Sequence, residues 1–217
     1  ALRQVNFPST LRYIGDFAFN ATKLEMNQLV IPEGVEEINQ YAFAFCRKLK
    51  AQVTLPSTIK KIGEWAFYGC PITSINLPEG LESLGSLAFW DCDLREVSIP
   101  SSCHEFNEGW QFGFNRNLEK MHLPEGMTEI PDHFAVDCFR LREVNFPHTL
   151  KHIGEKAFSL CISLKNVELP LGMQSLGEEA FSELEALEQI VFPASMKSLG
   201  KNSCSYWKNI KRNGISI

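Results

Sequence analysis

Apolar and polar residues alternate along the chain in short runs that each end at a proline. The run Val53-Thr54-Leu55-Pro56 shows the order: apolar, polar, apolar, proline. A period of two directs the first and third residues toward a core and the middle one outward, which predicts a short β-strand. Proline ends the strand because it has no N–H to donate to a neighbouring strand.

The same run returns throughout the sequence at intervals of 22 to 24 residues. The prolines that mark it are Pro8, Pro32, Pro56, Pro78, Pro100, Pro124, Pro147, Pro170 and Pro193. Self-similarity at this period predicts a solenoid of stacked units and not a globular enzyme fold. We expect strands near residues 5–7, 29–31, 53–55, 75–77, 97–99, 121–123, 144–146, 167–169 and 190–192.

Each run is followed by a turn signal, Pro-Ser-Thr or Pro-Glu-Gly, and then by two apolar residues three apart, such as Ile59 and Ile62. A glycine comes next in most units, at Gly15, Gly63, Gly85, Gly154, Gly177 and Gly200, with Asn39 and Asn107 replacing it in two others. Because glycine and asparagine tolerate positive φ, we expect a left-handed turn there. The acid that often follows suits the first turn of a helix.

The end of each unit carries Ala-Phe and, three residues later, often cysteine. On a helical wheel Ala157, Phe158 and Cys161 fall within about 100° of one another, so we expect all three to face the core of a short helix. The fold class is therefore predicted as an α/β repeat solenoid. We expect about nine strand-turn-short-helix units of 22–24 residues, with residues 1–217 forming a single array.

Three units depart from the pattern, which predicts local changes of geometry within the same fold. The fifth has a one-residue insertion between Phe106-Asn107 and Gln111-Phe112. The sixth has Pro131 in the place of the glycine and Phe134-Ala135 in reversed order, and the ninth has Ser203-Cys204 where Ala-Phe is expected.

The two ends of the sequence lack the polar caps that solenoids need where stacking stops. Leu2-Arg3-Gln4-Val5 matches the late part of a unit at residues 141–144, and Ile215-Ser216-Ile217 resembles the first strand of a tenth. We expect the chain to be a piece of a longer array or of a multidomain protein. A natural domain with unusual ends is the alternative.

The repeat resembles the BspA-like leucine-rich repeat family of bacterial and protist surface proteins. The segment IKKIGEWAFYGC at residues 59–70 carries the resemblance, together with the strand-proline run and the Cys-x-x-Leu ending. It extends over essentially all of the chain, and the asparagine ladder of ordinary leucine-rich repeats is absent. The resemblance implies a leucine-rich-repeat-like right-handed superhelix. It also implies a cell-surface or secreted location and adhesion to host or neighbouring-cell proteins, host extracellular-matrix proteins among them.

Composition excludes some functions. The hydrophobic fraction of 44% and the charged fraction of 22% are those of an ordinary soluble globular protein. The net charge is −5, and the chain has no run of five like charges, so nothing favours nucleic acid as a partner. No apolar stretch approaches the roughly 18 residues of a transmembrane segment.

Cysteine is the residue that first suggests chemistry. Five of the seven, Cys46, Cys70, Cys92, Cys138 and Cys161, occupy one repeat position. Other units place Thr22, Asn115, Leu184 or Trp207 at or near it, and a redox or metal role would not survive leucine. We therefore expect reduced, buried and replaceable cysteines that act as small hydrophobes. Stacking of successive copies leaves a disulfide between neighbours open.

No other group of residues predicts catalysis, a metal or a cofactor. His148 and His152 lie four apart but flank a predicted turn, so we expect them to be exposed to solvent and not to share one face of a helix. No zinc spacing, nucleophile elbow or phosphate loop occurs. The chain is predicted not to be an enzyme.

Two surfaces remain as candidate binding sites. Two residues after the glycine, the predicted helix carries an outward residue that is large and apolar in five successive units and polar in the next four. Its occupants are Phe17, Tyr41, Trp65, Leu87 and Trp110, then His133, Lys156, Glu179 and Asn202. We expect Trp65 and Trp110 to be partly exposed if this stripe binds a ligand. Packing of adjacent helices against one another is the alternative.

The second candidate is the outward face of the strands, which is rich in amides and hydroxyls. Its residues are Asn6, Thr54, Asn76, Ser98, His122, Asn145 and Glu168. A merely solvated sheet face is the alternative here. The sequence thus predicts a non-enzymatic recognition or adhesion module that binds a protein or glycan. The rival prediction is a structural spacer or assembly segment that docks on flanking domains or self-associates.

Overall fold

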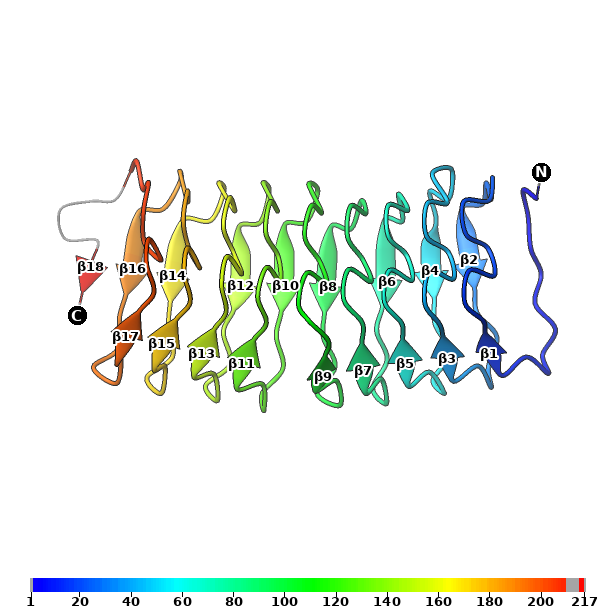
Figure 1. Ribbon diagram of the computed structural model, residues 1–217, viewed down its shortest axis with the longest axis horizontal. Helices are drawn as coiled ribbons and strands as arrows, with labels where there is room; N and C mark the ends of the chain where they lie inside the picture. The colour runs from blue at the N-terminus through cyan, green and yellow to red at the C-terminus, as the bar shows by residue number, and fades with distance from the viewer. Residues whose placement is uncertain (1, 210–214, 217) are drawn as a thin grey trace.

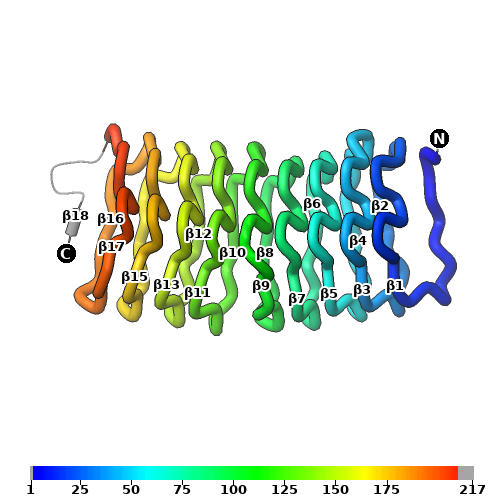
Figure 2. The backbone as a smooth tube through the Cα atoms, in the orientation of Figure 1, coloured from blue at the N-terminus to red at the C-terminus, as the bar shows by residue number. Residues whose placement is uncertain are grey.

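The computed structural model describes residues 2–209 and 215–216 of the 217-residue chain. The chain winds into a row of similar coils that stack along one long axis, with the two termini at opposite ends (Figure 1). Figure 2 shows each coil lying beside the coil that precedes it in sequence. The repeat solenoid predicted from the proline period is therefore confirmed.

One side of each coil carries a short strand, which in all but the last of the set comes just before the proline. These strands are β2 (Gln28–Val30), β4 (Gln52–Thr54), β6 (Ser74–Asn76), β8 (Glu96–Ser98), β10 (Lys120–His122), β12 (Glu143–Asn145), β14 (Asn166–Glu168), β16 (Gln189–Val191) and β18 (Ile215–Ser216). Leu29 and Ile31, predicted to point inward, are 0% and 2% exposed. The strands lie one residue earlier than predicted, because Ile31 makes the last ladder bond before Pro32, which has no N–H. Residues 5–7 form no strand.

A second set of strands, which the sequence pattern did not identify, lies on another side of each coil. They are β1 (Tyr13–Ile14), β3 (Glu37–Ile38), β5 (Lys61–Ile62), β7 (Ser83–Leu84), β9 (Glu105–Phe106), β11 (Glu129–Ile130), β13 (His152–Ile153), β15 (Ser175–Leu176) and β17 (Ser198–Leu199). Each contains the second apolar residue of the predicted pair, such as Ile62, which is fully buried. Each of these strands has only two residues, which is too short for an alternation of apolar and polar residues to be recognised in the sequence.

All strand pairs are parallel and join equivalent residues of successive coils, as in Gln28 with Gln52 or Glu37 with Lys61. The even-numbered strands form three sheets, β2-β4-β6, β8-β10-β12 and β14-β16-β18. The odd-numbered strands form two, β1-β3-β5-β7-β9 and β11-β13-β15-β17. The core therefore lies between two interrupted parallel sheets and a third side that holds no strand.

The short helices of the prediction are wrong. The described residues contain no α-helix, and the third side consists of turns at residues 15–22, 39–46, 63–70, 85–92, 107–115, 131–138, 154–161, 177–184 and 200–207. We call these the turn segments. Alternate N–H groups bond to the next coil, as Phe43 N–H does to the Ala66 oxygen at 2.8 Å, while those between them close turns within the coil. The predicted α/β class is therefore wrong, and the described residues form a solenoid of strands and turns.

Left-handed residues make this ladder possible. Each turn segment has two residues with positive φ, four positions apart, such as Tyr41 and Phe45 or Lys156 and Leu160, and the fifth segment adds Glu108 and Gly109. A left-handed residue reverses the helical course of the chain, so the backbone stays extended enough to reach its neighbour. The fifth unit disturbs the pattern: among the described residues, Leu87 N–H makes no bond to the coil that carries the insertion.

The glycine before each turn segment serves a different purpose from the one predicted. Positive φ is found at other glycines, such as Gly34 in the Pro-Glu-Gly turn, and not at Gly63 or Gly177. A Cβ at Gly63 would lie 2.8 Å from Asn39 C of the preceding coil, and one at Gly177 would lie 2.5 Å from Glu155 N. Glycine is therefore required by close backbone stacking.

The acid that follows the glycine also has a role other than the predicted one. In the absence of a helix there are no free N-terminal N–H groups to favour it. Instead Asp16 Oδ1 accepts a hydrogen bond from Gln40 N–H at 3.1 Å, and Asp132 Oδ1 accepts one from Glu155 N–H at 2.6 Å. The carboxylate thus links one coil to the next.

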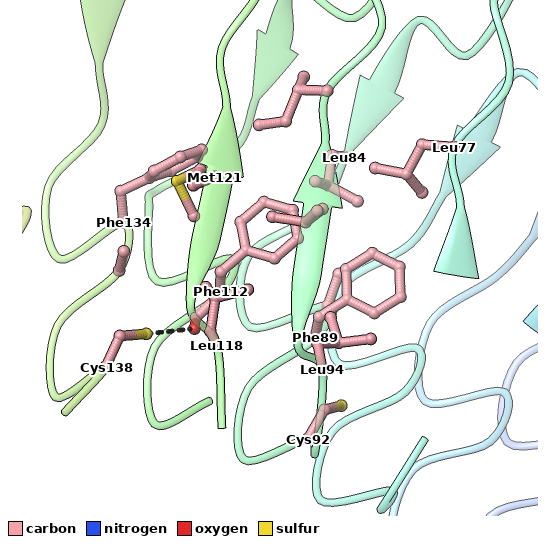
Figure 3. Packing of buried hydrophobic residues seen from close by; sticks show 14 of the residues in the cluster. Leu77, Leu84, Phe89, Cys92, Leu94, Phe112, Leu118, Met121, Phe134 and Cys138 are labelled. Carbon is pink, nitrogen blue, oxygen red and sulfur yellow. Dashed lines mark hydrogen bonds between the residues drawn. The ribbon is translucent and has the colours of Figure 1, made fainter. Parts of the chain in front are cut away.

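The core is a column of phenylalanine rings that continues from coil to coil. Phe43, Phe67 and Phe89 are fully buried and stack in order, with centroids 5.2 and 5.5 Å apart. Figure 3 shows the column continuing through Phe112, and Phe158 stacks on Phe181 at 5.6 Å in the second half. The inward direction predicted for Ala157, Phe158 and Cys161 is correct although its helical geometry is wrong, since all three are fully buried.

Candidate functional site

The predicted outward stripe is real but lies on left-handed residues and not on helices. We call it the turn-side column; its members are Phe17, Tyr41, Trp65, Leu87, Trp110, His133, Lys156, Glu179 and Asn202, with φ between 51° and 66°. Trp65 and Trp110 are half-buried, as expected for a surface that also packs, while Phe17 is 53% exposed. Neighbouring residues add rings on the same side.

A first aromatic cluster covers the coils of the first three units. The Phe17 and Tyr41 rings stack at 4.8 Å with 7° between their planes, and Tyr41 stacks on Trp65 at 5.2 Å and 13°. Tyr68 packs against Trp65 at 4.4 Å and against Phe45 at 5.1 Å. The rings thus form one continuous ladder along the stack.

A second cluster follows Leu87, which is half-buried between the two. Trp90 contacts Trp110 at 5.2 Å and Phe114 at 4.6 Å. His133 stacks on Trp110 with centroids only 3.6 Å apart, and its loss of hydration lowers the pKa of the imidazole. We call the two clusters together the aromatic face.

Cations border the aromatic face at two points. The Arg47 guanidinium lies 5.5 Å from the Phe45 ring and forms an ion pair with Asp91 at 3.0 Å. The Arg116 guanidinium lies 5.7 Å from the Phe114 ring. In the first cluster the Tyr41 ring is stacked between Phe17 and Trp65, so both of its broad faces are covered.

Beyond Trp110 the same column becomes polar. Lys156 Nζ lies 3.7 Å from Glu179 and 3.4 Å from Glu155, and Glu179 is the main cause of the raised pKa of Lys156. These side chains are half-buried near the surface, where such pairs contribute little stability. The polar part of the column therefore offers a matched internal comparison for the aromatic part.

The alternative site, the outward sheet face, forms the columns that the prediction describes. Thr54 pairs in register with Asn76, and His122 lies in register between Ser98 and Asn145. Asn6 lies outside any strand, and Glu168 belongs to the separate β14-β16-β18 sheet.

Several of these side chains are already bonded to one another. His122 Nε2 lies 3.2 Å from Glu96, and Lys120 lies 3.0 Å from Glu143. The Asn145 amide bonds the N–H and the C=O of Leu123, so it stabilises the stack. The predicted residues are spread along the stack. In the part of the chain that the structure describes, they do not line one common pocket.

The cysteine column proves to be a set of hydrogen-bond donors. Cys70 Sγ–H donates to the Phe43 carbonyl at 2.9 Å, and Cys138 Sγ–H donates to that of Phe112 at 3.3 Å (Figure 3). Asn115 and Trp207 make the same kind of bond through their own N–H groups. This shared function explains the substitutions better than size alone, and only Leu184 lacks a donor.

All seven cysteines are free, and six of them are buried. Burial raises the pKa of the Cys103 and Cys138 thiols to about 12. Cys46 differs, because hydrogen bonds from Cys70 and Thr22 outweigh burial and lower its pKa to about 7. The predicted reduced and buried state holds, and the disulfide left open between neighbours is not formed.

The histidines that lie four apart have separate partners. His148 Nδ1 lies 3.0 Å from Glu125, and His152 Nδ1 lies 2.7 Å from the Ser175 hydroxyl. His148 is exposed as predicted, whereas His152 is half-buried. Among the residues described, no group of three or more potential metal ligands comes together. Within the same part of the chain, no helix has the length and apolar character needed to cross a membrane.

Similar proteins share this architecture. A leucine-rich repeat protein from Bacteroides ovatus is 31% identical, with a TM-score of 0.83 over 95% of this chain and 55% of its own. A leucine-rich repeat protein from Eubacterium ventriosum is 17% identical, with a TM-score of 0.58 over 92% of this chain and 62% of its own. The leucine-rich repeat protein of T. pallidum is 26% identical, with a TM-score of 0.54 over 80% of this chain and 72% of its own.

The chain thus spans 55% and 62% of the first two relatives. A comparison with curated proteins found no match. The family model described as BspA type leucine-rich repeat region, in six copies, matches residues 1–52, 50–148 and 129–216. Because these matches cover nearly the whole sequence, the chain belongs to the BspA-type leucine-rich repeat family.

Proposed function

We propose that the chain is a non-enzymatic recognition module of a surface or secreted protein, and that the aromatic face is its contact surface. A protein partner is favoured over a glycan, because the ring planes of Phe17, Tyr41 and Trp65 are stacked on one another. The surface location rests on family membership. Repeat proteins of this kind commonly bind through extended faces of the stack.

One observation carries the proposal: bulky aromatic residues occupy left-handed positions in the first half of the turn-side column. Such a position costs an L-residue roughly 1–2 kcal/mol, and asparagine tolerates it better. The chain uses Asn202 and Lys156 at the same backbone geometry elsewhere. Selection for the side chain, and not for the backbone, accounts for tryptophan at positions 65 and 110. Aromatic anchors of this type dominate interface energies.

The test is a binding screen of the purified chain against an array of extracellular-matrix proteins and a glycan array. The double variant Trp65→Asn/Trp110→Asn should lose at least tenfold in affinity for any array protein that binds. The matched variant Lys156→Asn/Glu179→Asn, in the polar part of the same column, should bind as the wild type does. Equal binding by the wild type and both double variants would exclude the aromatic face as the contact surface.

Sedimentation of the same proteins separates recognition from the spacer alternative. A monomer that binds an array protein through Trp65 and Trp110 supports the recognition module. Self-association that the tryptophan variant abolishes, with no array protein bound, would instead favour an assembly segment.

A further inference from the structure

The odd-numbered sheet is interrupted at one place, between β9 and β11. β9 pairs with β7 and β11 pairs with β13, but no pairing joins β9 to β11. Figure 1 shows these two strands farther apart than their neighbours. Across the same two coils β8 still pairs with β10, and Phe112 N–H still bonds to the Phe134 oxygen at 2.9 Å. Only one side of the stack has therefore opened.

The sequence explains why the sheet opens here. In other coils the glycine N–H donates to the preceding odd strand, as Gly63 does to Ile38 at 2.7 Å and Gly154 to Ile130 at 2.9 Å. Pro131 stands in that place and has no N–H to donate. The inserted residue of the fifth unit also brings Gly109 against the Asp132 backbone. These are the two departures from the repeat that lie side by side.

The β9 edge directs the backbone groups of one residue toward the gap. Glu105 N–H donates toward β7, to the Glu82 oxygen at 3.1 Å, and Asn107 N–H donates to Leu84 on the same side. Successive residues of a strand direct their backbone groups to opposite sides. The N–H and C=O of Phe106 therefore point toward β11.

The β11 edge mirrors this arrangement. The Thr128 oxygen accepts a bond from His152 N–H at 3.2 Å and the Ile130 oxygen accepts one from Gly154 N–H, both on the β13 side. The N–H and C=O of Glu129 therefore point toward β9. Within the described part of the chain, β9 and β11 belong to different sheets and are not paired with each other.

A cleft lies between the two edges. Cavities of about 350 and 280 Å³ share His104, Phe106 and Glu129 as lining residues. The larger adds Glu108 and Asp132 at its rim, and the smaller reaches the buried side chains of Cys103 and Met127. Both volumes are near the lower end of the range for ligand sites. No lysine or arginine lines either cavity.

We propose that this cleft binds an extended, lysine- or arginine-bearing peptide segment, which adds as a strand between β9 and β11. The facing N–H and C=O groups of Phe106 and Glu129 require an extended backbone as their partner. The carboxylates of Glu108, Glu129 and Asp132 favour basic side chains on its outward face. Phe106 and Met127 provide an apolar contact for the residues between them. This site is separate from the aromatic face and does not depend on the function proposed for that face.

The probe is a fluorescein-labelled peptide in which lysine alternates with valine, titrated into the purified chain by fluorescence anisotropy. Saturable binding is expected, and a peptide with glutamate in place of lysine should bind at least tenfold more weakly. N-methylation of alternate amides should weaken binding in either phase, since one set of amides faces β9 and the other faces β11. Equal binding of the lysine and glutamate peptides, or indifference to N-methylation, would overturn the proposal.

Variants of the protein test the same cleft from the other side. Deletion of Gly109 combined with Pro131→Gly should restore the β9–β11 ladder and weaken peptide binding at least tenfold. Glu129→Gln should weaken it about twofold to fivefold, as for an exposed ion pair. Glu37→Gln, in the unbroken part of the same sheet, is the matched control and should change nothing.

Should the deletion variant fail to fold, Glu129→Gln and the N-methylated peptides still decide the question. Unchanged binding by Glu129→Gln together with insensitivity to N-methylation would place the peptide elsewhere.

Discussion

The aromatic and polar halves of the turn-side column share one backbone and differ in their side chains. All nine residues have φ between 51° and 66°, whether the occupant is Trp65 or Lys156. In both halves the residue's N–H bonds to the next coil, at 2.9 Å for Trp65 and 2.8 Å for Lys156. The coil therefore requires a left-handed residue at this place but not an aromatic one.

The difference between the halves lies in what the side chains contact. Trp65 stacks on Tyr41 and contacts Tyr68, whereas Lys156 forms ion pairs with Glu155 and Glu179. Stacked rings add about 0.5–1.5 kcal/mol per pair beyond the area they bury, which offsets part of the left-handed cost. The scaffold and the surface are thus separable, and each half can be used as a control for the other.

The largest expected effect tests whether the buried phenylalanine column contributes equally to stability in the two halves. Phe67→Ala and Phe158→Ala each remove a fully buried ring from the same column and should each cost about 3–5 kcal/mol in the free energy of unfolding. Urea denaturation followed by circular dichroism measures both. Lys156→Ala, two residues before Phe158 and outward, should be nearly neutral. Unequal losses from the two phenylalanines would mean that the halves differ in the core as well as on the surface.

A smaller effect tests whether the coils are stacked equally closely in both halves. Gly63→Ala and Gly177→Ala introduce a Cβ within 2.8 and 2.5 Å of backbone in the preceding coil. Overpacking of this kind typically costs about 1–3 kcal/mol. Gly15→Ala is the control, because nothing lies within 4 Å of its added Cβ. Its thermal midpoint should stay unchanged or rise slightly, since alanine restricts the unfolded chain.

The period of the prolines was enough to predict the solenoid, the strand columns and their inward residues. The turn segments could not be predicted, because Ala-Phe and a cysteine three residues later match the inward face of a helix. The left-handed positions carry Phe17, Tyr41 or Trp65, residues that rarely adopt positive φ, so no glycine or asparagine signal marked them. The glycine that was visible, as at Gly177, marked close stacking instead.

The candidate sites were predicted to different degrees. The outward stripe and the partial exposure of Trp65 and Trp110 could be read from the repeat alignment, although the helical reason was wrong. Pro131 and the inserted residue were visible as departures from the repeat. These two departures open the odd-numbered sheet and leave the even-numbered strands β8 and β10 paired, because Pro131 lacks the N–H that would bond to β9. The sequence pattern did not identify the odd-numbered strands, so this effect could not be predicted.

The smallest effect addresses the comparison of the halves directly. Trp65→Asn removes contacts with Tyr41 and Tyr68 but places a better left-handed residue at position 65. The free energy lost with the two ring contacts slightly exceeds the gain in backbone preference. The net cost should therefore be about 1 kcal/mol in the free energy of unfolding, a shift of roughly 2–4 °C in the thermal midpoint. Lys156→Asn gains the same backbone preference and loses only ion pairs near the surface, which contribute little, so its midpoint should stay level or rise. Calorimetry of the two single variants measures the contrast. A loss of several kcal/mol from Trp65→Asn alone would mean that the aromatic face is primarily a stabilising element of the first coils, and the tryptophans would then be weak evidence for a binding surface.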